Sequence, residues 1–221
     1  MARTEYQAQL DALRADVLAM SGGVLHRYDQ ALETIETGDR DLAERVVDGD
    51  HEINQLYLDL EADCIDLFAL QQPVASDLRF VASTFKILTD LERVGDLATN
   101  LADYAGDTGT ERYPEVDLRA IGEFAGEMVR DAMTAYDDAD VEACRAVAAR
   151  DDELDRRCAE AAQAIVADLL RAEAGPDADE VLDDATRLML VLRDLERVGD
   201  HAVNVSARTL YMVEQDDELI Y

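Results

Sequence analysis

The sequence predicts an all-α protein built as two tandem antiparallel three-helix bundles, with six long helices in total. The chain of 221 residues is rich in alanine and leucine and has only three prolines, a composition that favours helix throughout. Clusters of helix-breaking residues divide the chain into six long segments. A third observation is that the seven-residue sequence DLERVGD occurs unchanged in both halves, which indicates an internal duplication.

The first half contains three predicted helices. The first spans residues 4–37 and has a glycine pair near its middle, where we expect a kink. Gly38–Asp39 then provides a C-terminal cap for this helix and an N-cap for the next one. The second helix extends to residue 70 and stops before Pro73, because a residue that precedes proline disfavours the helical conformation. The third helix is predicted over residues 74–104.

The second half repeats this order. The sequence AGDTGTERYP is the richest cluster of helix breakers and marks the predicted boundary between domains 1–108 and 109–221. The fourth helix covers residues 116–135, and Asp137–Asp140 supply a turn and a cap for the fifth. The fifth helix reaches residue 172, Gly175–Pro176 turn the chain, and the sixth helix runs to residue 214.

The two halves align over more than one motif. Asp90–Asp96 is repeated as Asp194–Asp200, which lies 104 positions later, and DHEIN at Asp50–Asn54 aligns with DDELD at Asp151–Asp155 at an offset of 101. The difference of three residues falls in a turn, where insertions are tolerated. Each half is therefore expected to form one three-helix bundle.

The charge of the chain excludes several functions. There are 51 acidic and 20 basic residues, which gives a formal net charge of -31. Such a charge repels the phosphates of nucleic acids and the surface of an anionic membrane. Lys86 is the only lysine. We interpret the composition as halophilic, suited to a salt-rich cytoplasm in which ions screen the carboxylates; the alternative is an ordinary acidic protein with a cation-binding site.

The cysteines and the hydropathy pattern bear on the cellular compartment. Three widely spaced cysteines without a C-x-x-C motif are typical of small apolar helix residues in a reducing environment. The N-terminal sequence lacks the features of a signal peptide. No apolar run approaches the roughly 20 residues that span a bilayer. We expect a soluble cytoplasmic protein without direct membrane insertion.

Acidic residues recur at helical spacing within the repeated motif. Glu92 and Asp96 are four positions apart on one helix and share a face, and Asn100 extends that stripe by one more turn. The second copy consists of Glu196, Asp200 and Asn204. An apolar series with steps of three and four residues leads to each glutamate, so we expect both glutamates at the edge of the core. These series are Leu78, Val81, Phe85 and Leu88, and Leu182, Ala185, Met189 and Leu192.

The preceding helix brings a second pair of polar side chains to the same height. A hairpin that turns near residue 72 places Asp50 level with residue 94 and Asn54 level with residue 90. A hairpin that turns near residue 175 places Asp151 level with residue 199 and Asp155 level with residue 195. Two independent turns thus bring each polar pair beside an E-x-x-x-D pair.

Converging carboxylates repel one another unless a positive charge lies between them. A bound cation would supply that charge, and oxygen ligands favour hard ions such as Mg²⁺, Ca²⁺, Mn²⁺ or oxidised iron. The alternative is that Arg93 and Arg197 neutralise the neighbouring acids in surface ion pairs. The pattern alone leaves both interpretations open.

Motifs of common enzymes are missing from the sequence. It contains no phosphate-binding P-loop, no G-x-S-x-G and no H-E-x-x-H. A ferritin-like di-metal oxidase needs E-x-x-H on two helices, and none of the three histidines has a glutamate three positions before it. We therefore expect no enzyme activity, no catalytic residues and no organic cofactor.

These repeated motifs resemble the PhoU family, the accessory proteins of the phosphate-specific transport system. The resemblance covers the whole chain, including the QQP turn before Asp77–Arg79. It implies a cytoplasmic regulator of phosphate homeostasis that negatively regulates the high-affinity ABC phosphate transporter through its ATPase subunit PstB. It also implies a homodimer and, where one exists, a PhoR-like histidine kinase as a further partner.

The same resemblance implies metal ions bound at the repeated acids. Iron in multinuclear clusters is favoured, with Mn, Mg, Ca and Zn as alternatives. The implied ligands are Asp50, Asn54, Glu92, Asp96, Asn100, Asp151, Asp155, Glu196, Asp200 and Asn204. Asn54 stands where an acid is expected, so the first-half site carries one negative charge fewer. The alternative functions are a metal-free helical scaffold or interaction protein and a carboxylate-bridged metalloenzyme.

Overall fold

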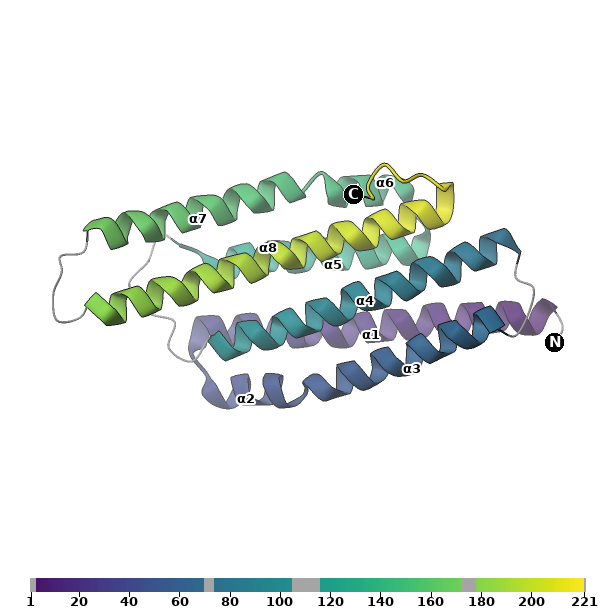
Figure 1. The fold of residues 1–221 in the computed structure, drawn as a ribbon, viewed down its shortest axis with the longest axis horizontal. Helices are drawn as coiled ribbons and strands as arrows, with labels where there is room; N and C mark the ends of the chain where they lie inside the picture. The colour runs from purple at the N-terminus through teal and green to yellow at the C-terminus, as the bar shows by residue number, and fades with distance from the viewer. Residues whose placement is uncertain (1–2, 70–73, 105–115, 172–177, 221) are drawn as a thin grey trace.

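A computed structural model describes residues 3–69, 74–104, 116–171 and 178–220, and the regular elements within these ranges are all α-helices. The prediction of an all-α fold is therefore confirmed. The helices are α1 (Arg3–Thr37), α2 (Arg40–Asp48), α3 (Asp50–Ala69), α4 (Ala75–Tyr104), α5 (Leu118–Asp138), α6 (Val141–Ala148), α7 (Asp151–Arg171) and α8 (Ala178–Glu214). They form the six predicted long helices, because α2 with α3 and α6 with α7 occupy the positions of the second and fifth (Figure 1).

The second and fifth helices, which the sequence predicts to be continuous, are each interrupted. The backbone N–H of Gly49 donates to the carbonyl oxygens of Arg45 and Val47, which ends α2, and α3 begins at the next residue. In the second half the N–H of Ala149 donates in the same way and ends α6. Gly49 is a helix breaker that could have been read from the sequence, whereas the second interruption contains neither glycine nor proline.

The predicted N-caps are present at equivalent positions of the two halves. A carboxylate oxygen of Asp39 accepts from the N–H of Leu42 at 3.0 Å, and one of Asp140 accepts from the N–H of Ala143 at 3.0 Å. The residue before each cap is in the left-handed region. Gly38 has a φ of 65° and Ala139 a φ of 53°, so the duplication preserves a conformation that favours glycine.

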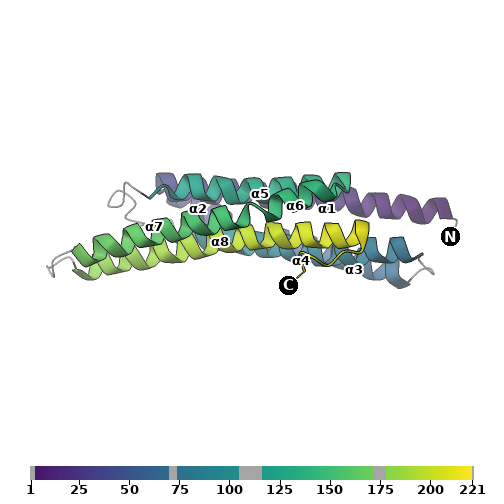
Figure 2. The same ribbon diagram turned by 90° about the horizontal axis from the view of Figure 1, so that it is seen from above.

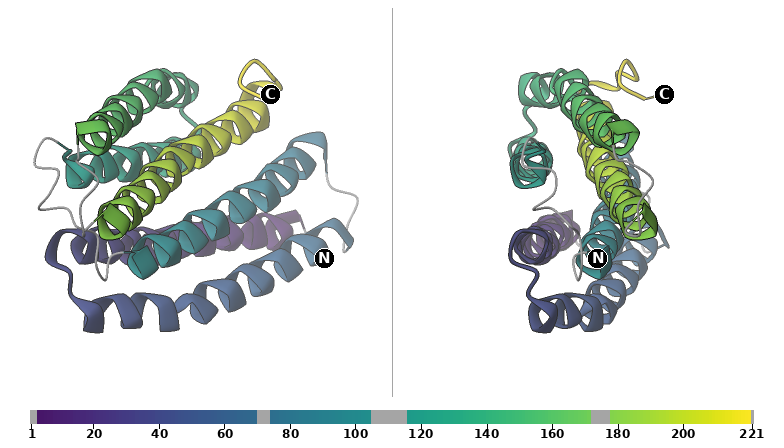
Figure 3. Two further views of the ribbon diagram at one scale, coloured as in Figure 1. Left: turned by 60° about the vertical axis from the view of Figure 1, so that its left-hand side comes forward. Right: turned by 90° about the vertical axis from the view of Figure 1, so that its left-hand side faces the viewer.

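The helices lie in two layers. Helices α3, α4, α8 and α7 lie side by side in one layer, while α1 and α5 lie behind them (Figures 2 and 3). Helices α4 and α8 are antiparallel neighbours at the centre of the larger layer (Figure 1). The α3–α4 and α7–α8 hairpins consequently point to opposite ends of the molecule.

One hydrophobic core contains side chains from both halves. Two buried hydrogen bonds cross between the halves inside it: Tyr28 Oη donates to the carbonyl oxygen of Gly122 at 2.8 Å, and the hydroxyls of Thr84 and Tyr136 are 2.8 Å apart. The two repeats are therefore packed as one body. The predicted domain boundary after residue 108 lies outside the described residues, so the division into 1–108 and 109–221 stays a prediction.

No helix in the described part of the chain combines the length and apolar character that crossing a membrane requires.

Candidate metal centres

The α3–α4 cluster consists of Asp50, Asn54, Glu92, Asp96 and Asn100, all of them half-buried. Asn54 Nδ2 donates to Asp50 Oδ2 at 2.7 Å, within α3. Thr99 Oγ1 of α4 donates to Asp50 Oδ1 at 3.1 Å, so Asp50 lies level with Thr99 instead of residue 94. The observed register is thus about one helical turn further along α4 than expected.

Burial and mutual repulsion act on the acids of this cluster. The pKa of Glu92 is raised by burial first and by the Asp96 carboxylate second, and the pKa of Asp96 is raised by burial and then by Asp50. Arg93 opposes both shifts, because its guanidinium lies 3.6 Å from Glu92 Oε2 and 3.7 Å from Asp96 Oδ2. In the first half, Arg93 therefore neutralises part of the charge of the neighbouring acids, as the alternative interpretation predicts.

The α7–α8 cluster is formed by Asp151, Asp155, Glu196 and Asp200, whereas Asn204, the fifth predicted ligand of this half, contacts α4. Burial raises the pKa of Asp151 to about 6, and the carboxylates of Asp155 and Asp200 add to that shift. Although Glu196 and Asp200 are exposed, partial desolvation by the surrounding protein and then repulsion from Asp155 raise the pKa of both. Four carboxylates from two helices thus act on one another here.

An unpartnered oxygen marks this second cluster. Asp151 Oδ1 is buried and has no hydrogen-bond partner among the described residues. The Arg197 guanidinium lies 3.3 Å from Asp194 Oδ1, and together with His201 it only partly opposes the rise in the pKa of Asp200. Glu196 is exposed, whereas Glu92 is half-buried; the expectation of a core-edge position is therefore correct for Glu92 and wrong for Glu196, whose side of α8 is open to solvent.

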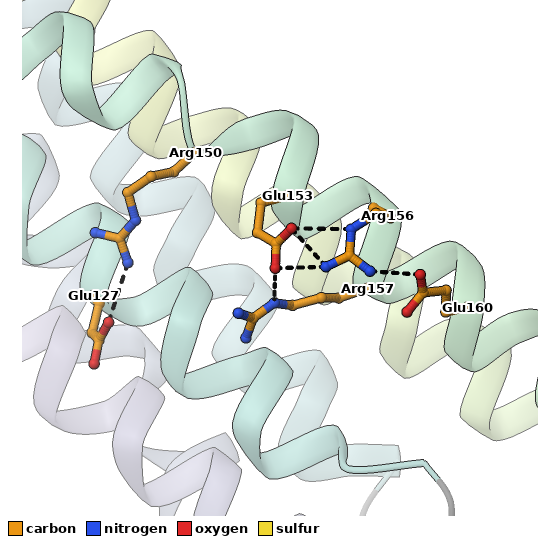
Figure 4. Close-up of polar contacts among 6 residues, drawn as sticks. All are labelled: Glu127, Arg150, Glu153, Arg156, Arg157 and Glu160. Carbon is orange, nitrogen blue, oxygen red and sulfur yellow. Dashed lines mark hydrogen bonds and ion pairs between the residues drawn. The ribbon is translucent and has the colours of Figure 1, made fainter.

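The other arginines near this cluster are paired elsewhere. Arg156 and Arg157 form ion pairs with Glu153, and Arg156 also pairs with Glu160 (Figure 4). Helical spacing puts these residues on the side of α7 opposite Asp151. Arg150 is paired with Glu127 of α5. None of these pairs brings a positive charge to the α7–α8 cluster.

Asn204 has a partner in the other half of the molecule. Its Nδ2 donates to Asp90 Oδ1 at 3.1 Å, and His201 Nδ1 lies 2.9 Å from the same oxygen. The equivalent residue in the second half, Asp194, is fully buried and lies 2.8 Å from Arg193. Asp90 and Asp194 are the first residues of the two DLERVGD copies. Neither is among the predicted site residues, although the exact duplication includes both positions.

The donors in both clusters fit a hard cation in kind. They are carboxylates and amides, and Asp151 Oδ1 lacks a partner. Among the described residues, however, no three His, Cys, Asp or Glu side chains converge closely enough to hold a metal ion in their present positions. The cysteines Cys64, Cys144 and Cys158 are free and buried, as expected for apolar helix residues.

The comparison with known proteins decides the family. The PhoU domain is matched at residues 17–105 and 118–209, once in each repeat. The chain belongs to the PhoU family. The resemblance seen in the DLERVGD motifs is therefore confirmed.

Individual relatives cover nearly the whole chain. A PhoU homologue from Pseudomonas putida, a phosphate-specific transport system accessory protein, is 34% identical over 216 residues, which are 96% of this chain and 82% of the relative. The crystal structure of PhoU from Pseudomonas aeruginosa superposes with a TM-score of 0.87 at 31% identity and covers 96% of this chain and all of that one. The phosphate transport system regulatory protein PhoU from Streptococcus pneumoniae, with a TM-score of 0.83 at 24% identity over 96% of this chain and 98% of that one, shares the fold.

Proposed function

We propose that this PhoU protein is a metal-binding adaptor that negatively regulates the high-affinity ABC phosphate transporter. Membership of the family supports an accessory role in phosphate transport, since relatives carry that name. The observation that carries the metal proposal is the unpartnered buried oxygen of Asp151, which lies among carboxylates whose pKa values are raised. A cation bound there would reduce the repulsion between the carboxylates and would give the unpartnered oxygen of Asp151 a partner.

The two clusters would each hold metal. The α3–α4 ligands would be Asp50, Asn54, Glu92, Asp96 and Asn100, and the α7–α8 ligands Asp151, Asp155, Glu196, Asp200 and Asn204. The amides of Asn54 and Asn204 donate to Asp50 and Asp90 through nitrogen, so their oxygens remain available as ligands. Oxidised iron, as more than one ion, is the proposed metal, with Mn, Mg, Ca and Zn as alternatives. When bound, it supplies positive charge that ties each pair of helices together.

The proposed partners follow from family membership. The chain would act at the cytoplasmic side of the transporter by contact with a PstB-like ATPase subunit, as a homodimer, and with a PhoR-like histidine kinase where one is present. It would perform no catalytic step of its own. Regulation would then consist of binding of this protein to the transporter and its release.

Elemental analysis of the purified protein tests the metal proposal. We expect bound metal in the wild type, a large loss in Glu196→Gln/Asp200→Asn, and loss of the remainder when Glu92→Gln/Asp96→Asn is added. Glu153→Gln/Glu160→Gln removes two acids from the opposite side of α7 and should retain the metal. Full retention of metal in the four-site variant would refute the assigned ligands.

A metal-free helical scaffold is the second candidate, because Arg93 already pairs with Glu92 and Asp96. In addition, no three acids among the described residues lie close enough together to hold a metal ion in their present positions. It predicts wild-type protein without stoichiometric metal that still represses phosphate uptake when expressed beside the transporter. The adaptor proposal predicts that the metal-free four-site variant no longer represses uptake. Uptake measurements with radiolabelled phosphate separate the two.

A further inference from the structure

Exposed apolar side chains are concentrated on the two outer hairpins. Of the twelve large apolar residues exposed in the described part of the chain, nine lie on these hairpins. The first strip consists of Leu58, Ile65 and Phe68 of α3 with Val74, which precedes α4, and Leu78 in the first turn of α4. The second strip consists of Val166 and Leu170 of α7 with Leu182 and Met189 of α8.

The two strips correspond at two positions under the duplication, whereas the equivalents of Leu58, Val74 and Leu170 are alanines. Ile65 and Val166 occupy matching positions of α3 and α7, with exposed fractions of 53% and 43%, and Leu78 and Leu182 occupy matching positions of α4 and α8, with 45% and 53%. Isolated exposed apolar residues need no explanation, whereas a contiguous patch marks an interaction site.

Each strip leads into an acidic cluster on the same side of its helix. Leu78 and Glu92 are two intervals of seven residues apart on α4, and Leu182 and Glu196 are separated identically on α8. Residues at seven-residue intervals lie on one side of a helix. The outer surface of each hairpin is therefore apolar at its tip and acidic further along.

Both strips lie on one face of the molecule. Helix α4 packs against α1, α2, α3 and α8, and α8 packs against α4, α5, α6 and α7. Their open sides consequently face away from the layer that contains α1 and α5 (Figure 3). Because α4 and α8 are antiparallel, the strips lie toward opposite ends of that face (Figure 1).

Charge selects the occupant. A second copy seated on the strips would bring like charges together there, since the chain has a net charge of -31 and Asp59, Asp66 and Asp183 beside the strips are exposed. The proposed homodimer would therefore use another surface. An amphipathic helix with leucine-like residues on one side and arginine or lysine along its margins complements both the apolar tip and the acids.

We infer that the two strips are equivalent docking surfaces for a positively charged amphipathic helix, so that one chain engages two copies of its partner. This inference deepens the proposed adaptor function and rests on it for the setting in which the partner is met. Two equivalent surfaces related by the antiparallel α4–α8 pair suit a partner that is itself a symmetric dimer.

A synthetic probe tests the surface directly. We would use a labelled helix of about 18 residues with leucines at intervals of three and four and arginines beside them, and measure its binding to the full chain by fluorescence anisotropy. The expected stoichiometry is two per chain. Ile65→Gln/Leu78→Gln should leave only the second strip able to bind, and Val166→Gln/Leu182→Gln should leave only the first. The variant that combines these four changes should bind the probe at least tenfold more weakly.

Matched controls sharpen this result. Val47→Gln/Val213→Gln removes exposed apolar residues outside the strips and should keep both sites, and a probe with glutamate in place of arginine should not bind. Unchanged binding in the four-site variant, equal binding of the acidic probe, or a change in the oligomeric state of that variant by sedimentation would overturn the inference.

The outcome is separable from that of the proposed function. In a co-purification with the transporter ATPase subunit, the wild type should associate, and this association should be lost in the variant that combines the four apolar-to-glutamine changes. That result supports the docking surface. Association that persists in that variant overturns the docking surface and leaves the adaptor proposal intact. A wild type that binds two probe helices but neither associates with the transporter nor represses uptake refutes the adaptor proposal alone.

Discussion

Asn204 of α8 donates through Nδ2 to Asp90 Oδ1 of α4 at 3.1 Å, and thereby joins the two halves of the chain. His201 reaches the same oxygen at 2.9 Å. Asp90 is mostly buried, with 14% of its side chain exposed. This carboxylate therefore satisfies two polar groups at the centre of the α4–α8 contact.

Replacement of Asp90 by alanine should destabilise the protein by about 1–3 kcal/mol, because the partly buried ring of His201 and the amide of Asn204 lose their shared partner. Asp90→Asn keeps an acceptor oxygen and should cost less. Chemical denaturation at constant salt measures both, with Asp63→Ala, an exposed acid of α3, as the control. Equal stability of Asp90→Ala and the control would show that the contact contributes nothing.

The left-handed residue before each N-cap gives a second prediction. Ala139 has a φ of 53°, where a Cβ atom is strained, so Ala139→Gly should stabilise the protein by about 0.5–1 kcal/mol. The reverse change at the equivalent position, Gly38→Ala, should destabilise it by about 1 kcal/mol. A Cβ at Gly38 would meet no atom within 4 Å, so this pair isolates the backbone effect. Thermal melts of the two variants should shift in opposite directions.

Much of this fold could be predicted because local signals agree with the tertiary structure. Asp39 and Asp140 cap helices as their positions indicate, and the repeat fixes the six-helix plan. The interruption at Ala149 could not be predicted, since the two N–H bonds that end α6 occur without any breaker residue. It depends on how α6 and α7 pack on the rest of the molecule.

The identity of the candidate site residues could be predicted from the sequence better than the packing around them. The apolar series before Glu92 merges two rows of seven-residue spacing: Val81 and Leu88 are buried, whereas Leu78 is exposed. Which row faces the core depends on where α8 lies, which the periodicity of α4 does not contain. The contact of Asp90 with His201 was missed for the same reason, since it requires the packing of one half against the other.

The two mid-helix glycines of the repeated motif should respond differently to alanine. A Cβ at Gly199 would overlap with Leu154 Cδ2 of α7, a fully buried side chain, whereas a Cβ at Gly95 would lie 3.3 Å from Ile53 Cγ2. Gly199→Ala should cost about 1–3 kcal/mol through overpacking. Gly95→Ala should be close to neutral, because the gain in helix propensity of roughly 1 kcal/mol offsets the tighter contact. Equilibrium unfolding of the two variants side by side checks this difference.

Salt should stabilise this chain. With a net charge of -31, the folded state concentrates repelling carboxylates, and at about 1 M salt the Debye length falls to roughly 3 Å. We expect the Tm to rise as KCl is added, by about 2–4 °C for each kcal/mol gained. A variant with several exposed acids replaced by their amides should show a shallower rise. A midpoint that stays level or falls in KCl would contradict the halophilic interpretation.

The shared core makes each repeat depend on the other for folding. The bonds from Tyr28 to Gly122 and between Thr84 and Tyr136 cross from one repeat to the other, and α4 covers α8 along the centre. A polypeptide carrying a single repeat would leave that surface bare and would have to find a twin before it could fold stably. Covalent fusion removes this search, so the two halves are present in equal number at any protein concentration and can diverge separately in sequence.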